Sequence, residues 1–205
     1  MKNVARITLV SAVLMTIPAM ASEVGVMVDK QFGKAQTVAA GAFVGTPAGK
    51  FDSVGPTGFG IRGAYTVLNL KVAELGLTAS YHPKAEGDLV IDGTKYGKLG
   101  NEYMAIGAQM DWKFLINLHL GLDLRREKFT TSEFKDAVNN GSTTTTRPWV
   151  RAGIGFSVPT PVVSPFLRLE VAMTTSKEDK TDNTDNLRKA LAPEYQVGLY
   201  GGIRF

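Results

Sequence analysis

The chain has 205 residues, of which 23 are Lys or Arg and 19 are Asp or Glu, so its formal charge is only +4. So small an excess gives no basic face for nucleic acid, and no nucleic-acid partner is expected. Cysteine is absent. Disulfides therefore cannot stabilise this chain, which needs a sufficient core or a sheet that closes on itself.

The first 21 residues are predicted to be a secretory signal peptide. Lys2 and Arg6 precede an apolar run over 7–17, and Ala19-Met20-Ala21 forms a small-x-small cleavage site. The run is too short to span a membrane, and no later stretch has eighteen consecutive apolar residues. We expect residues 1–21 to be removed and 22–205 to form one domain, with a charge of +2 once the two basic leader residues are lost.

After the leader, segments of alternating apolar and polar residues recur with a period of about 46 residues, the signature of repeated hairpins. Segments that begin alike start at Gly58, Tyr103, Trp149 and Tyr195. A second family starts near Val72, Leu118 and Val163, and one period back from Val72 predicts a strand near residue 26. The expected strands are 23–32, 58–67, 71–82, 102–113, 117–127, 148–158, 163–174 and 195–205.

The connections between these strands differ in length from one rim to the other. Three are short, whereas 33–57, 83–101, 128–147 and 175–194 are long and polar. This asymmetry and the even strand count predict an all-β fold, an eight-stranded antiparallel up-and-down transmembrane β-barrel with its short turns in the periplasm. Segment 36–45 also alternates, but a ninth strand would put the C-terminus on the wrong rim. We expect it to extend the first hairpin above the membrane; the alternative is an inward-folded plug.

One face of the expected strands is apolar and suits lipid. Aromatic residues lie toward the strand ends of this face, as in the girdles at the two lipid–water interfaces. They are Phe59 and Tyr81 on one rim, and Tyr65, Trp112, Phe114, Phe156 and Phe205 on the other.

The opposite face carries charges of both signs in equal number. Its acidic residues are Asp29, Glu74, Asp111, Asp123, Glu127 and Glu170; its basic residues are Arg62, Lys113, Arg125, Arg151, Arg168 and Arg204, and His119 joins them. An eight-stranded barrel is just wide enough for side chains to fill. We interpret the set as a packed, salt-bridged core, with a narrow ion path as the alternative. A soluble lipocalin-like barrel with exchanged faces is the rival fold.

Residues that could carry chemistry are few, and no enzyme, cofactor or metal site is expected. His82 is interpreted as a rim residue, and Ser80 two positions earlier as a chance neighbour, because no carboxylate is clearly placed to orient the imidazole. Asp123 and His119 share a strand face and are assigned to the salt network. The acidic stretch 178–185 has calcium-like oxygen ligands but lacks the glycine and terminal glutamate of an EF-hand loop, so we interpret it as a solvated loop.

The last strand, 195–205, resembles the C-terminal strand of Gram-negative outer-membrane barrels. Its outward positions Val197, Leu199, Ile203 and Phe205 alternate up to a terminal aromatic residue. The chain thus resembles the small barrels of the OmpA transmembrane-domain, OmpX and OmpW type, but without a periplasmic domain after Phe205. The resemblance implies an outer-membrane location, contact with membrane lipid and lipopolysaccharide, a monomeric state, and assembly by periplasmic chaperones and the barrel-assembly machinery, which recognises this strand.

Two classes of function follow from this interpretation. In the first, the barrel is closed and has a structural or surface-interaction role through its extracellular loops. In the second, it is a narrow channel for ions or for small solutes, apolar ones included. The balanced interior charge favours the first class. A third class, a lipid-modifying enzyme, would require hydrolase activity that depends on His82 or Ser80.

Overall fold

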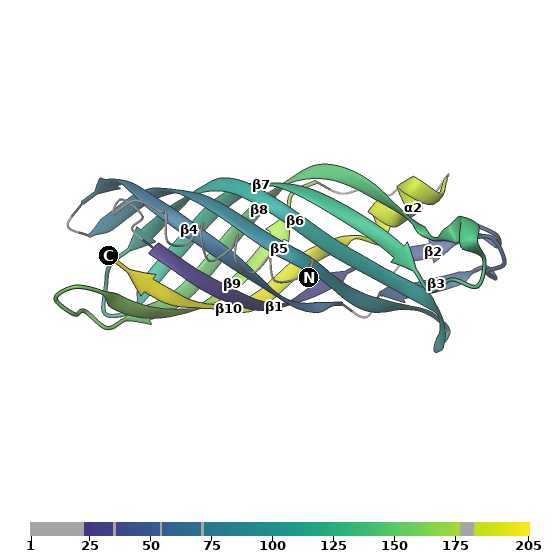
Figure 1. Cartoon of the computed structure of the whole chain (residues 1–205), viewed down its shortest axis with the longest axis horizontal. Coiled ribbons are helices and arrows are strands. Elements are labelled where there is room, and N and C mark those ends of the chain that lie inside the picture. Colours follow the sequence, from purple (N-terminus) through teal and green to yellow (C-terminus); the bar gives the residue numbers. More distant parts are fainter. Residues whose placement is uncertain (1–22, 35, 54, 71, 177–182) are drawn as a thin grey trace, which may run out of the picture.

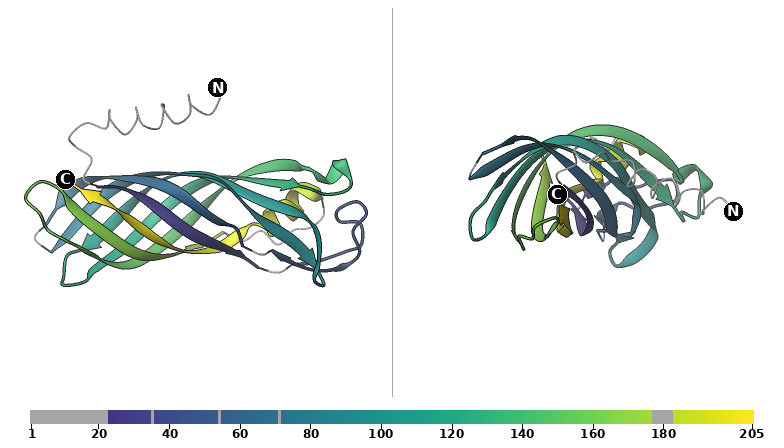
Figure 2. Two further views of the ribbon diagram at one scale, coloured as in Figure 1. Left: turned by 60° about the horizontal axis from the view of Figure 1, so that its bottom comes forward. Right: turned by 60° about the vertical axis from the view of Figure 1, so that its left-hand side comes forward.

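The computed structural model describes residues 23–34, 36–53, 55–70, 72–176 and 183–205. Within them, ten strands form one antiparallel sheet in the order β2-β3-β5-β4-β1-β10-β9-β8-β7-β6, in which β2 is Gln36–Val38 and β3 is Gly49–Ser53, and β5 also pairs with β6. This last pairing closes eight strands into a barrel (Figure 2). The eight are β1 (Glu23–Gly33), β4 (Thr57–Asn69), β5 (Ala73–Ile91), β6 (Thr94–Trp112), β7 (Asn117–Ser132), β8 (Gly141–Ser157), β9 (Ser164–Thr174) and β10 (Pro193–Arg204).

The two faces of the wall differ in polarity, because successive side chains of a strand point to opposite sides. Along β7, for example, Leu118, Leu120 and Leu122 are exposed on the outside, while the residues between them are buried inside. An apolar outer wall around a polar interior is the polarity of a transmembrane barrel. The predicted eight-stranded fold is confirmed, and the lipocalin-like arrangement of the faces is wrong. No helix in the described ranges is long and apolar enough to cross a membrane.

The first and last strands close the barrel. β1 pairs with β10 in a register that runs from Glu23↔Arg204 to Phe32↔Tyr195. Phe205 therefore ends at the rim where β1 begins, opposite the rim that carries α2 (Thr184–Ala190), β2 and β3 (Figure 1). We call the first the periplasmic rim, after the orientation that the sequence predicts, and the second the loop rim.

Two of the four predicted loops are wrong, because the strands run well past the apolar wall at the loop rim. Segment 83–101 is mostly a continuous hairpin, in which β5 reaches Ile91 and β6 begins at Thr94. The two turn residues, Asp92 and Gly93, have φ values of 46° and 81°, as type I′ hairpin turns require. Segment 128–147 likewise continues β7 and β8 and leaves only a short connection with the 3-10 helix η1 (Ala137–Asn139).

The other two long connections contain short elements. In 33–57, β2 (Gln36–Val38) pairs with β3 (Gly49–Ser53), and β3 pairs with the distal end of β5, so this segment extends the sheet beyond the barrel. In 175–194, α2 (Thr184–Ala190) is capped by Asn183, whose side chain accepts a hydrogen bond of 2.8 Å from the Asn186 amide. The predicted signal peptide and most of the acidic stretch 178–185 lie outside the described residues.

Candidate functional site: the barrel interior

The inward face gathers charged side chains from six of the eight barrel strands (β1, β4, β6, β7, β8 and β9) into a buried network. Its members are at most 6% exposed: Glu23, Asp29, Arg62, Asp111, His119, Asp123, Arg125, Glu127, Arg147, Arg151, Arg168 and Glu170. Some inward positions must be glycine to leave room for these long side chains. A Cβ on Gly121, for example, would lie 2.7 Å from the guanidinium carbon of Arg151.

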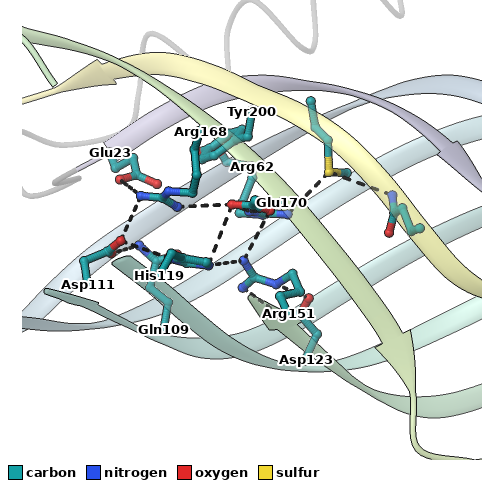
Figure 3. Close-up of polar contacts among 12 residues, drawn as sticks. Glu23, Arg62, Gln109, Asp111, His119, Asp123, Arg151, Arg168, Glu170 and Tyr200 are labelled. Atoms are coloured by element: carbon teal, nitrogen blue, oxygen red, sulfur yellow. Dashed lines mark hydrogen bonds and ion pairs between the residues drawn. The ribbon is translucent and has the colours of Figure 1, made fainter. Parts of the chain in front are cut away.

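Glu170 lies at the centre of the network (Figure 3). Its carboxylate accepts bonds of 2.9 and 2.8 Å from Nη1 of Arg62 and one of 3.2 Å from Nη1 of Arg168. Nη1 of Arg151 and Nε2 of His119 are 3.8 and 3.7 Å from its oxygens. One carboxylate from β9 thus compensates guanidinium groups from β4, β8 and β9, and its loss would leave them without their shared anion.

A second group of charges lies toward the periplasmic rim. Arg168 Nη2 donates to Asp111 at 2.9 Å and lies 3.4 Å from Glu23, while Arg204 Nε donates to Glu23 at 2.9 Å. Gln109 adds a bond of 2.9 Å to the other oxygen of Asp111. These contacts join β1, β6, β9 and β10 across the lumen, so the network crosses the barrel rather than following its wall.

His119 links the two groups. Its Nδ1 lies 3.0 Å from Asp111 Oδ1, and its Nε2 lies 2.8 Å from Arg151 Nη1. Because Arg151 can only donate, this geometry requires an imidazole that donates from Nδ1 and accepts at Nε2. Arg151 also forms a two-bond pair with Asp123, at 2.6 and 3.0 Å. Asp123 therefore binds arginine, and no bond joins it to His119 among the described contacts.

Between His119 and the loop rim, the interior combines cations with aromatic rings. The guanidinium of Arg125 lies between Tyr103 and Trp149, 4.5 and 4.1 Å from the ring centroids, a favourable cation–π arrangement. Arg147 and Glu127 form a two-bond pair at 2.5 and 3.0 Å, and the Trp149 indole donates to the same carboxylate at 3.2 Å.

His82 is buried in the interior, and its prediction as a rim residue is wrong. Its side chain is 0% exposed and stacks on Tyr103, with 4.9 Å between the ring centroids. Nε2 lies 3.0 Å from Asp29 Oδ2, so the carboxylate that sequence reasoning missed is supplied by β1. Nδ1 lies 2.8 Å from the Pro83 carbonyl. Both ring nitrogens thus lie within hydrogen-bond distance of an oxygen.

An apolar cluster lies at the loop rim. It joins the distal parts of β5, β6 and β7 to the segment after β2 and to α2. Its buried members are Phe43, Phe51, Leu89, Ile91, Leu99, Phe129, Phe134, Leu187, Leu191 and Ala192. We call it the apolar plug. The apolar members of the plug come from segments predicted to be polar loops.

The remaining predicted residues lie at the barrel surface or rim. Lys113 forms an ion pair of 2.5 Å with Glu74, and both are partly exposed at the periplasmic rim, below the buried network. The wall and rim residues that are exposed include Phe59, Tyr65, Phe114, Phe156, Phe205, Val197, Leu199 and Ile203. Tyr81 and Trp112 are partly buried.

Several interior residues were absent from the predicted set. Glu23 is the first residue of β1, and Arg147 was assigned to a loop although Arg147, Trp149 and Arg151 alternate with a period of two. That alternation was the signal that could have placed Arg147 inside. In the described part of the chain, no group of three or more His, Cys, Asp or Glu could hold a metal ion.

Comparisons with known proteins found no matching family model and no matching curated protein. Among solved structures, the chain is similar to Ail, the attachment invasion locus protein of Yersinia pestis, at 18% identity, over 91% of this chain and 100% of that one, with a TM-score of 0.41. It is also similar to Neisserial surface protein A, at 12% identity, 88% and 95% coverage and a TM-score of 0.43. A third is the outer membrane protease OmpT of Escherichia coli, at 11% identity, 90% and 93% coverage and a TM-score of 0.39. These similarities are too low to assign the role of any of these proteins to this chain. The fold is established by the strand pairing described above.

Proposed function

We propose that the chain is an outer-membrane β-barrel that does not conduct and that has a structural or surface-interaction role through its loop rim. The observation that carries this proposal is the filled interior. Ion pairs centred on Glu170 cross the lumen, Arg125 and Trp149 occupy the level above, and the apolar plug covers the mouth. A hydrated path would have to break buried ion pairs and also wet an apolar cluster.

Planar-bilayer recording on the refolded full chain tests this proposal. We expect no steady conductance at either polarity. The Glu170→Gln variant and the exposed-site control Glu133→Gln should be equally silent if the interior stays packed. A steady ion-selective conductance in the unmodified protein, altered by Glu170→Gln but not by Glu133→Gln, would overturn the closed-interior proposal in favour of a narrow channel.

The finer partner proposal is contact with lipopolysaccharide phosphates just above the apolar wall. On the outer face of β7, the exposed leucines end at Leu124 and are followed by Arg126 and Lys128, both exposed. Across the β6–β7 ladder, Glu102 is opposite Lys128. Guanidinium and ammonium groups bind phosphate strongly, and this row lies where the hydrocarbon region gives way to headgroups.

Thermal unfolding in vesicles with and without lipopolysaccharide tests this contact. We expect lipopolysaccharide to raise the Tm of the unmodified barrel, and the double change Arg126→Gln with Lys128→Gln to remove most of that increase. The control Lys34→Gln with Lys50→Gln removes the same charge from the exposed segment beyond β1. An equal loss in both double variants would show that net charge, not this row, is responsible.

Export and assembly form the last part of the proposal. We infer that residues 1–21 are a cleaved signal peptide, that the barrel is monomeric, and that chaperones and the assembly machinery recognise the outward face of β10. Mass measurement of the mature protein should give Ser22 as the first residue. Phe205→Ala should lower the amount of folded barrel in the outer membrane without changing its unfolding midpoint after refolding in vitro. An unchanged amount would remove Phe205 from the recognition signal.

A further inference from the structure

Three turns at the periplasmic rim expose apolar side chains at their tips. Leu115 is 99% exposed and Val162 is 81% exposed. Turns that face water are usually built from small and polar residues. We call the exposed apolar residues of these three turns the turn ring: Leu68, Leu70, Val72, Phe114, Leu115, Ile116, Val158 and Val162.

The apolar wall on this side of the barrel is too short to match a membrane by itself. On β7 it runs from Leu118 to Leu124. The six steps between these residues give a height of roughly 15 Å at a rise of ~3.3 Å and a tilt of ~40°. The lipid-facing band of outer-membrane barrels is about 25 Å tall. Extending the wall down to Leu115 would add up to about 8 Å, which nearly closes the gap.

The apolar band on this side of the barrel can extend only toward the periplasmic rim. Its upper border on this side is charged, because Arg126 and Lys128 follow Leu124 on β7 and the Tyr81 hydroxyl donates to Glu102 at 3.0 Å. On the opposite side, the outward residues of β10 from Tyr195 to Phe205 span about 25 Å without any turn. That span also ends at the periplasmic rim, where the turn ring lies (Figure 1).

The turn backbones already satisfy many of their own polar groups, which lowers the cost of leaving water. The Leu70 amide donates to Ala73 at 2.8 Å, and the Val158 amide donates to Pro165 at 2.9 Å. The Lys113 amide donates to the Val72 carbonyl at 2.9 Å and so joins two neighbouring turns. These are main-chain bonds that persist when lipid replaces water.

We infer that the turn ring is inserted among the phospholipid acyl chains of the periplasmic leaflet, and that the barrel sits low in the membrane. Acyl chains are the expected contact because the turn ring continues the apolar wall that faces lipid. The exposed side chains from Leu118 on the wall to Phe114 on the ring are all apolar. Lys113 and Glu74 at the same rim pair with each other, and the long stem of a lysine can keep its ammonium at headgroup level. This inference rests on the proposed membrane location.

Spin labels test the inference, and the absence of native cysteine makes single labels simple. Leu70→Cys, Leu115→Cys and Val162→Cys are labelled separately and reconstituted in phosphatidylethanolamine–phosphatidylglycerol vesicles. Leu122→Cys in the middle of the wall is the lipid reference, and Lys50→Cys on β3 is the water reference. We expect the three turn labels to be relaxed by oxygen and protected from a water-soluble nickel chelate, as at position 122. Heat-modifiable migration on gels confirms that each variant is folded.

The outcomes separate the two levels of the proposal. Turn labels that behave like position 50, while position 122 reports lipid, overturn the inference and leave a water-exposed apolar ring for a periplasmic protein. Turn labels and position 122 that both report water overturn the membrane location itself. Labels that report lipid at Leu115 and Val162 but water at Leu70 also overturn insertion of the ring as a whole.

Discussion

At the scale of single residues, Glu170 holds together more cations than any of its neighbours in the described interior, and its removal should be costly. We expect Glu170→Ala to lower the free energy of unfolding by about 3–5 kcal/mol, because it leaves Arg62 and Arg168 buried without their shared anion. Urea titration of refolded protein in micelles measures this change. The exposed control Glu133→Ala should stay within about 0.5 kcal/mol. Equal effects of the two substitutions would mean that the interior is hydrated.

His82 and Asp29 form the residue pair closest to a catalytic arrangement, and their burial favours a structural role. We expect His82→Phe to keep the stack on Tyr103 but to destabilise the barrel by roughly 1–3 kcal/mol, because Asp29 loses its partner. His82→Phe combined with Asp29→Leu should cost less than the sum of the single changes, which a double-mutant cycle in urea measures. Additive costs, or a hydrolase activity lost in His82→Phe or Ser80→Ala at unchanged stability, would contradict the structural role.

At the scale of elements, the tip of the β5–β6 hairpin has an exposed ion cluster whose pH dependence has a definite sign. The ammonium groups of Lys98 and Lys95 lie 2.5 and 3.3 Å from the Glu133 carboxylate and hold its pKa below the ordinary value. Hydrogen bonds to Asp88 and Glu133 raise the pKa of Lys95. A lowered carboxyl pKa means that these contacts are present above the unfolded pKa and are lost as the pH falls through the folded one.

Carboxyl chemical shifts recorded during an acid titration measure this dependence. We expect Glu133 to titrate at lower pH than an unpaired glutamate, and its midpoint to rise toward the ordinary value when Lys98 is replaced by Gln. The effect on global stability should be small, because every member is at least partly exposed and the pairs are screened. A Glu133 midpoint that does not move in the Lys98→Gln variant would show that this ion pair does not form in solution.

The element scale also shows how far the sequence alone could predict the structure. Period-two alternation placed all eight strands and the two faces, because a strand between lipid and a polar interior has no other stable pattern. The strand ends at the loop rim, such as Ala85 to Ile91 of β5, were not predicted. There the two faces of a strand meet water or the apolar plug instead of lipid and a polar interior. The Asp92-Gly93 pair was a readable hairpin signal. Long-range partners such as Asp29 for His82 could not be found, because tilt and register decide which inward residues meet.

At the scale of the whole molecule, we propose that the barrel is closed twice and that the two closures are independent. The apolar plug lies at the loop rim, and the ion pairs around Glu170 cross the lumen below it. We therefore expect Phe43→Ala with Leu187→Ala to weaken the plug, at about 2–5 kcal/mol for each large buried side chain, without opening a conducting path. Planar-bilayer recording on this double variant, beside the unmodified protein, measures the result. If the plug variant conducts steadily, the plug alone closes the barrel and the buried ion pairs surround a hydrated lumen; if it stays silent, closure is a property of the packed interior.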